Sequence, residues 1–245
     1  MLTKGMSCQR IKSTLISVAL LLCFVQTARS DERVLPPENL LTQFEITMGK
    51  LVIGRGEDQL SHNGVTYTLT SKTQPKGIAK LFLDEIIRES KGAITNSGVV
   101  PSEFHETGNE KRGDLSANFD WKNKRLTLRR NESKEDVELP KFALDQAILP
   151  YSFSFSSIKK ENNVIYLTDG KKLKKYTYEY VGQETIDTTL GKLECFHFRK
   201  QREETNSRGF EFWLSKSHHN LPVKIRFIGK GERTFESTIT AINYR

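Results

Sequence analysis

The sequence predicts a mainly β protein with a single curved antiparallel sheet, a half-barrel-like meander of about ten to twelve strands with one or two short helices. Three observations predict it. Apolar residues recur at every second position through most of the chain, turn-forming residues separate these runs at short intervals, and only two segments have a helical pattern.

The alternation is the primary signal. Successive side chains of a strand point to opposite faces, so apolar residues at every second position place one face in a core and the other toward solvent. The clearest runs lie at residues 115–121, 176–180, 196–198, 210–214 and 223–227.

Turn chemistry punctuates these runs. Gly, Asn and Asp tolerate the positive φ angles that tight reversals require, and short strands joined by such reversals form an antiparallel meander. The best examples lie at residues 62–64, 96–98, 169–170 and 229–231.

Two segments break the pattern of alternation. Residues 77–83 and 142–149 each predict a short helix, and Pro150 ends the second because proline cannot continue a helix.

The N-terminus carries the signature of a secretory signal peptide. Lys4, Arg10 and Lys12 precede an apolar run over residues 13–25, and small residues then permit cleavage between Ser30 and Asp31. The run is shorter than the ~20 residues of a membrane-spanning helix, although an uncleaved N-terminal anchor is the alternative. We therefore predict a signal peptide at residues 1–30, a flexible lead-in at 31–39 and one β domain at 40–245, exported to the periplasm of a Gram-negative bacterium.

Removal of the signal changes the global composition. The whole chain has 38 basic and 30 acidic residues, a net charge of +8, but residues 1–30 hold four of the basic residues and no acid. The remaining 34 basic and 30 acidic residues leave +4, a mild surplus that disfavours a nucleic-acid partner. Cys195 is the only cysteine after residue 30, so no internal disulfide is expected.

No motif predicts a catalytic residue, a cofactor site or a metal site. Ser156 and Lys159 match the S-x-x-K pattern of penicillin-binding enzymes, but the alternating residues 151–155 before them suggest a strand, on which residues three apart face opposite ways. Cys195 and His197 share a predicted strand face, and a half-buried structural pair is favoured over a metal site because no further ligands are clustered nearby.

The order of the motifs resembles a bacterial exported family known as "domain of unknown function 3108". The resemblance covers nearly all of residues 40–245 and is carried by the segments 44–54, 67–82, 119–130, 169–191, 196–198, 212–214 and 220–225. One departure is Gln146, since the family usually has proline after the aspartate that matches Asp145. The resemblance implies a curved antiparallel sheet similar to the half-barrels that carry lipoproteins or lipids, and it implies no catalytic residue.

Two distributed features suggest a function. Basic residues gather at 122–130, 171–175 and 199–202, and the chain has 14 Phe, seven Tyr and two Trp with little helix to cover them. A cavity between the sheet and residues 77–83 is the default binding site, whereas a dry core filled by the aromatic residues is the alternative.

We expect a non-enzymatic binding or envelope-maintenance protein whose partner is a lipid, a lipoprotein or an anionic envelope polymer. Two other functions stay open: a structural or protein-interaction module, and a cryptic hydrolase of cell-wall polymers for which Asp120, Cys195 and His197 are the candidate residues. The residues leave the ligand and the oligomeric state open.

Overall fold

The computed structural model describes residue 1 and residues 35–108, 113–202 and 208–244, except for the side chain of Lys230. The predicted signal peptide, its cleavage site at Ser30 and Asp31, and residues 31–34 of the lead-in lie outside this part. The described strands are β1 Asn39–Met48, β2 Leu51–His62, β3 Thr66–Pro75, β4 Ile86–Thr95, β5 Gly98–Thr107, β6 Leu115–Asp120, β7 Arg125–Arg130, β8 Ser133–Glu138, β9 Ala143–Asp145, β10 Asn163–Thr168, β11 Leu173–Thr188, β12 Gly191–Lys200, β13 Gly209–Ser215, β14 Pro222–Ile228 and β15 Thr234–Tyr244. The helical elements are α1 Leu149–Ser152 and three 3-10 turns, η1 Gly77–Leu81, η2 Phe153–Phe155 and η3 Lys230–Glu232.

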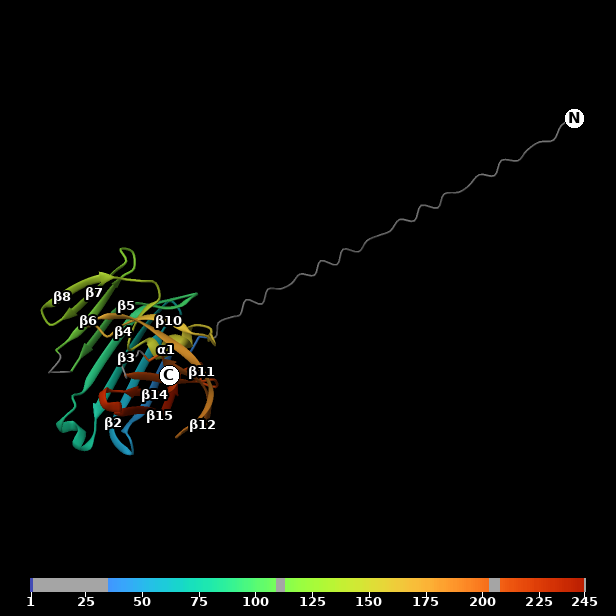
Figure 1. Cartoon of the computed structure of the whole chain (residues 1–245). Coiled ribbons are helices and arrows are strands. Elements are labelled where there is room, and N and C mark those ends of the chain that lie inside the picture. Colours follow the sequence, from blue (N-terminus) through green and yellow to red (C-terminus); the bar gives the residue numbers. More distant parts are fainter. Residues whose placement is uncertain (2–34, 109–112, 203–207, 245) are drawn as a thin grey trace. The chain divides into compact units, whose positions relative to one another are not determined.

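All fifteen strands belong to one sheet, in the order β8-β7-β6-β5-β4-β3-β2-β1-β15-β14-β13-β12-β11-β10-β9. Neighbouring strands are antiparallel except for β9 and β10, which are parallel. Strands β1 to β8 form one half in chain order and β15 to β9 form the other, and the halves meet where β1 pairs with β15 (Figure 1). The mainly antiparallel, curved sheet is confirmed, but the expected number of ten to twelve strands is wrong.

The extra strands lack the pattern from which strands are recognised. In β8 the side chains are exposed except for the partly buried Val137, so both faces are solvated and nothing alternates. Strand β9 has only three residues, all buried. A strand with two equivalent faces, or with fewer than four residues, leaves no period-two signal in the sequence.

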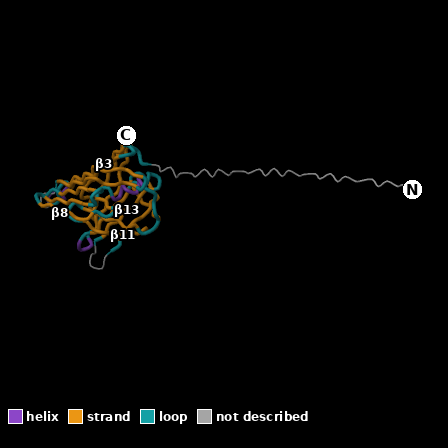
Figure 2. Tube along the Cα trace, turned by 90° about the horizontal axis from the view of Figure 1, so that it is seen from above, coloured by secondary structure: helices purple, strands orange, loops and turns teal. Residues whose placement is uncertain are grey.

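The largest hydrophobic cluster lies between the two halves of the sheet. It joins buried side chains of β1 to β7, such as Leu60 and Phe104, with Phe198 and Phe212 of the other half. The segment formed by α1 and η2 contributes Tyr151, Phe153 and Phe155 to the same cluster, and all three are buried. In Figure 1 α1 lies among the strands, and Figure 2 shows one helical segment among the strands and another projecting at the edge of the domain.

The predicted helix over residues 142–149 is misplaced. Residues 143–145 form β9, and α1 begins at Leu149, so Pro150 lies in the first turn of the helix and does not end it. Proline is favoured in a first turn because the N–H that it lacks would have no partner there. The predicted helix over residues 77–83 is confirmed as the 3-10 turn η1.

Asp145 organises the turn that leads from β9 into α1. One of its carboxylate oxygens accepts hydrogen bonds from the N–H groups of Ala147 and Ile148, both at 3.0 Å. Its other oxygen accepts from Ser90 Oγ at 2.6 Å. The N–H of Gln146 donates to the carbonyl of Thr168, a bond that the proline usual in the family could not make. The buried turn thereby replaces the first turn of the expected helix.

The last residues before β1 are held against the sheet. His62 Nε2 lies 2.8 Å from the carbonyl oxygen of Pro36, and the backbone N–H of His62 donates to the carbonyl oxygen of Glu38. Within the described ranges, no helix has the length and apolar character needed to span a bilayer.

Candidate functional site

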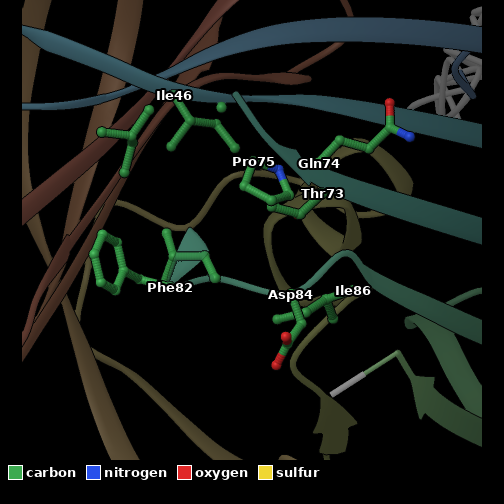
Figure 3. A pocket seen from close by; sticks show the side chains of 10 residues that line it. Ile46, Thr73, Gln74, Pro75, Phe82, Asp84 and Ile86 are labelled. Atoms are coloured by element: carbon green, nitrogen blue, oxygen red, sulfur yellow. The ribbon is translucent and has the colours of Figure 1, made fainter. Parts of the chain in front are cut away.

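A cavity of about 320 Å³ lies between the sheet and the connection from β3 to β4. This volume is at the lower end of the roughly 300–1,000 Å³ typical of small-molecule sites. Its lining residues are Ile46, Ile53, Gly54, Thr73, Gln74, Pro75, Phe82, Leu83, Asp84 and Ile86. Figure 3 shows Ile46 and Pro75 on one side and Phe82 on the other, with the polar ends of Gln74 and Asp84 pointing away from the middle. We call this cavity the apolar pocket.

The pocket arises from the way in which the chain leaves β3. The N–H of Lys76 donates to the carbonyl of Ile53, which ties the end of β3 to β2. Gly77 follows with φ +55°, a conformation that favours glycine and turns the chain away from the sheet. Ala79, which is buried, anchors η1, and its carbonyl accepts from the N–H groups of Phe82 and Leu83. The connection therefore stands over β1, β2 and β3 and leaves space beneath it.

Gly54 permits the close approach of β3 at the base of the apolar pocket. A Cβ atom at this position would lie 2.8 Å from the carbonyl oxygen of Gln74, which belongs to the backbone and cannot easily move. We expect Gly54→Ala to lower the free energy of unfolding by about 1–3 kcal/mol, because the two strands must separate. Gly56→Ala on the same strand is the control, since its Cβ meets nothing closer than 3.4 Å. Urea unfolding of both variants tests this, and equal stabilities would contradict it.

A second, polar hollow of about 700 Å³ adjoins the apolar pocket. The two share Gln74, Pro75, Leu83 and Asp84 in their linings. The polar hollow is also lined by Arg55, Lys76, Lys80, Glu85, Ile87 and Gly108. An apolar space therefore opens beside a space with three basic side chains.

The charges of the polar hollow are unevenly compensated. Glu85 contacts Gln74 and lies 3.0 Å from Lys72 Nζ, and these hydrogen bonds, with that of Gln74 the larger, lower the pKa of its carboxyl. Arg55 Nε donates to Gln74 Oε1 at 2.8 Å. Lys76 and Lys80 form no ion pair with any acid in the described part of the chain. These two lysines are therefore available cations of the hollow, as is Arg55, which contacts only the neutral Gln74, and Asp84 is the acid that opposes them.

The interior of the curved sheet is occupied by side chains of the large hydrophobic cluster. Tyr151 occupies it with its hydroxyl 2.7 Å from Asp58 Oδ2 and 2.9 Å from Thr42 Oγ1. Burial raises the pKa of the Asp58 carboxyl. Tyr67 and Ser90 make the corresponding contact with Asp145, since Tyr67 Oη lies 3.0 Å from Ser90 Oγ. These polar contacts join α1 to β1 and β2, and β9 to β4, inside the core.

Cys195 and His197 do share one face of β12, as their spacing predicts, but the two differ in their surroundings. Cys195 is fully buried, its Sγ lies 3.4 Å from the carbonyl oxygen of Leu193, and burial raises the pKa of the thiol to about 12. A thiol with so high a pKa is neither a nucleophile nor a ready metal ligand. No group of three or more His, Cys, Asp or Glu side chains suited to a metal occurs within the described ranges.

His197 lies between two carboxylates that sequence reasoning missed. Its Nδ1 is 2.9 Å from Glu184 Oε1 on β11, and its Nε2 is 3.1 Å from Glu211 Oε2 on β13. The imidazole stacks on Trp213 at 4.2 Å between ring centroids, and Trp213 Nε1 donates to Glu184. On the Glu211 side of the cluster, Arg226 Nη1 lies 3.4 Å from Glu211 Oε2. Each ring nitrogen contacts a carboxylate on a different neighbouring strand. The cluster therefore joins β11, β12 and β13.

The other candidate residues are separate from this cluster. Asp120 accepts from the backbone and side chain of Asn123 and from Arg125 in the β6–β7 turn, so it acts within its own hairpin. The strand expected at residues 151–155 is wrong, because these residues form the end of α1 and the whole of η2. Ser156 follows η2 in an extended conformation and Lys159 is exposed outside any helix, so the S-x-x-K residues lack the helical geometry of the enzymes that they match.

Comparison with solved structures supports the fold. A beta-barrel-like protein of the domain of unknown function DUF1849 from Brucella abortus aligns with a TM-score of 0.57 and 9% identity, over 86% of this chain and 99% of that chain. An inferred exported protein from Bacteroides fragilis gives 0.38 and 9% over 85% and 98%, and an inferred lipoprotein from Parabacteroides distasonis gives 0.36 and 13% over 85% and 97%. The last two TM-scores are too low to support an argument about fold or function.

Comparison with sequences gives one result. A model of the family described as "Protein of unknown function (DUF3108)" matches residues 43–238. The match spans the strands from β1 to β15, and it confirms the resemblance that the order of the motifs carries. No curated protein matches the sequence significantly.

Proposed function

The chain belongs to the DUF3108 family, and we propose that it is an exported, non-enzymatic protein that binds a hydrophobic or amphiphilic molecule of the cell envelope in the apolar pocket. We further propose that cleavage after Ser30 releases a periplasmic protein whose single domain begins near residue 40. The observation that carries the proposal is the apolar pocket, which is lined by six apolar side chains and adjoins the polar hollow with its three basic side chains.

The two adjoining spaces support an amphiphile better than a purely polar ligand. A hydrocarbon segment placed among Ile46, Ile53 and Phe82 would leave water, which is the main favourable contribution to binding such a group. Its polar end would then lie in the neighbouring hollow, within reach of Lys76 and Lys80.

Filling the apolar pocket tests the proposal. Ile46→Trp places a larger side chain in a space that the ligand would occupy, so we expect 1-anilinonaphthalene-8-sulfonate, an anion with an apolar body, to bind at least about tenfold more weakly. Fluorescence titration measures the affinity. Native mass spectrometry of the wild-type protein purified from the periplasm shows whether an envelope molecule is retained.

Gln43→Trp is the matched control, because Gln43 lies on the same strand, is exposed and lines neither space. It should bind the probe like the wild type. An unchanged affinity in Ile46→Trp, with both variants folded by circular dichroism, would reject the apolar pocket as the binding site. A wild-type protein that binds no probe and retains no lipid would reject the function itself.

A structural or interaction module is the second candidate, and the filled core favours it. The edge strand β8 does not, because its exposed Lys134, Glu135, Asp136 and Glu138 discourage strand addition. Crosslinking in cells distinguishes the two functions: a single protein partner with an empty pocket would support the module.

A further inference from the structure

Exposed apolar side chains gather at one end of the sheet, around the mouth of the apolar pocket. They come from two connections, the β1–β2 hairpin and the segment between β3 and β4. The members are Met48, Leu51, Val52, Ile78, Leu81, Phe82 and Leu83, and we call them the apolar tip. Ile78, Leu81 and Phe82 are 67%, 75% and 71% exposed, which is unusual for residues of this size.

The sheet register places the two connections side by side. Gly54, three residues after the start of β2, pairs with Pro75 at the end of β3, so the hairpin and η1 project from the same end. Figure 1 shows both there, the hairpin in blue and η1 in teal, at the bottom of the domain. The apolar tip is therefore one surface built by two separate loops.

The charges within the apolar tip have one predominant sign. Lys50 lies between Met48 and Leu51 in the hairpin, and Lys76 and Lys80 flank Ile78. None of these three lysines has an ion-pair partner among the described residues. Asp84 opposes them at the inner side, whereas Glu85 is already engaged by Lys72.

Apolar side chains that project between lysines are suited to the interface of a lipid bilayer. The apolar groups enter the boundary between head groups and acyl chains, and the lysines remain at the level of the phosphates. A second copy of this chain is a poorer occupant, because a two-fold contact through the same surface would bring Lys50, Lys76 and Lys80 of both copies together.

We infer that the apolar tip docks on the surface of an anionic lipid bilayer, with Leu51, Ile78 and Leu81 inserted among the head groups. The inference does not require the apolar pocket to hold a ligand. It goes beyond the proposed function because it names the surface on which the protein works. Docking would also bring Phe82 and Leu83, which line the pocket, to the membrane, so that an amphiphile could pass between bilayer and pocket without crossing water.

Vesicle sedimentation tests the inference on the protein purified as cells produce it, with its N-terminus read by mass spectrometry. We expect binding to phosphatidylcholine vesicles that contain phosphatidylglycerol and weaker binding to phosphatidylcholine alone. Ile78→Ser/Leu81→Ser should bind at least tenfold more weakly, and Lys76→Glu/Lys80→Glu should lose the preference for phosphatidylglycerol. Val65→Ser/Val164→Ser, which removes two exposed apolar side chains elsewhere, is the control and should bind like the wild type.

Three results would overturn the inference: no binding to anionic vesicles, equal binding by the Ile78→Ser/Leu81→Ser variant, or a wild-type dimer that this variant dissociates. All variants change exposed residues, and an unchanged melting temperature verifies their folding. The dye titration without vesicles reports on the pocket separately, since Ile78 and Leu81 do not line it. Loss of vesicle binding with intact dye binding, or the reverse, therefore shows which of the two proposals fails.

Discussion

Replacement of Asp145 by alanine is expected to lower the free energy of unfolding by about 3–5 kcal/mol. The carboxylate is fully buried and accepts hydrogen bonds from Ser90, Ala147 and Ile148. Without it, two backbone N–H groups and one hydroxyl lose their acceptor inside the core, where water cannot replace it. Asp145→Asn keeps an oxygen that can accept from the backbone, so it should lose less than half as much.

The free energy of unfolding of the wild type and of Asp145→Asn should also depend differently on pH. Burial raises the pKa of Asp145 from 3.8 to about 6, although hydrogen bonds from Ser90 and the backbone oppose the shift. Between these two values the folded protein keeps a proton that the unfolded chain has released, so Asp145 makes the protein less stable as the pH rises through this range. The wild type should lose up to ~3 kcal/mol between pH 4 and pH 7 relative to Asp145→Asn. Urea unfolding at several pH values measures the difference, and parallel curves would contradict it.

Replacement of His197 by alanine is expected to cost about 3 kcal/mol. Glu211 and Glu184 would each lose a hydrogen bond with the imidazole, and Trp213 would lose the ring stacked on it. Hydrogen bonding from His197 is the largest cause that lowers the pKa of Glu211. The stabilisation from Glu211 is therefore present above pH ~4.5 and is lost as the pH falls through its lowered pKa, and this acid loss should be smaller in the variant.

His105→Ala provides the matched control for this cluster. His105 lies on β5 with its side chain half exposed, and its Nε2 is 4.0 Å from Glu103. An exposed pair of this kind contributes at most about 1 kcal/mol. Thermal unfolding of the two variants should therefore separate them clearly. A small effect in His197→Ala would mean that Lys224 and Arg226, which lie over Trp213, hold the three strands without the histidine.

Prediction from the sequence succeeds for features that a short stretch of residues determines by itself. Phe198 stands between the polar residues His197 and Arg199, and it is buried on the predicted sheet. Gly77 and the apolar residues after it predict a short helix over the sheet, and the apolar pocket does lie beneath that segment. Period-two alternation and turn chemistry are local properties, so one sequence suffices to read them.

The remaining features depend on pairing between distant strands. Glu184 and Glu211 reach His197 only because β11, β12 and β13 pair in one register, shifted by a bulge between Tyr180 and Gly182. No pattern within a single strand predicts that register. The helix was misplaced for a related reason: residues 143–145 have helical composition, but their pairing with β10 and the side chain of Asp145 hold them as a strand and a turn. Tertiary contacts override local propensity at both places.

The pairing of β1 with β15 has a consequence for how the chain reaches its folded state. Each half of the sheet is built almost entirely from neighbours in sequence, so its hairpins can form while the rest of the chain is still absent. Pairing of residues 39–48 with 234–244 closes a loop that contains nearly the whole domain. Closing this loop costs entropy, and that cost is offset only by the contacts that form when β15 pairs with β1. The protein should therefore fold slowly and complete its sheet only once β15 has been synthesised, with the two half-sheets exposed to mispairing until β15 pairs with β1.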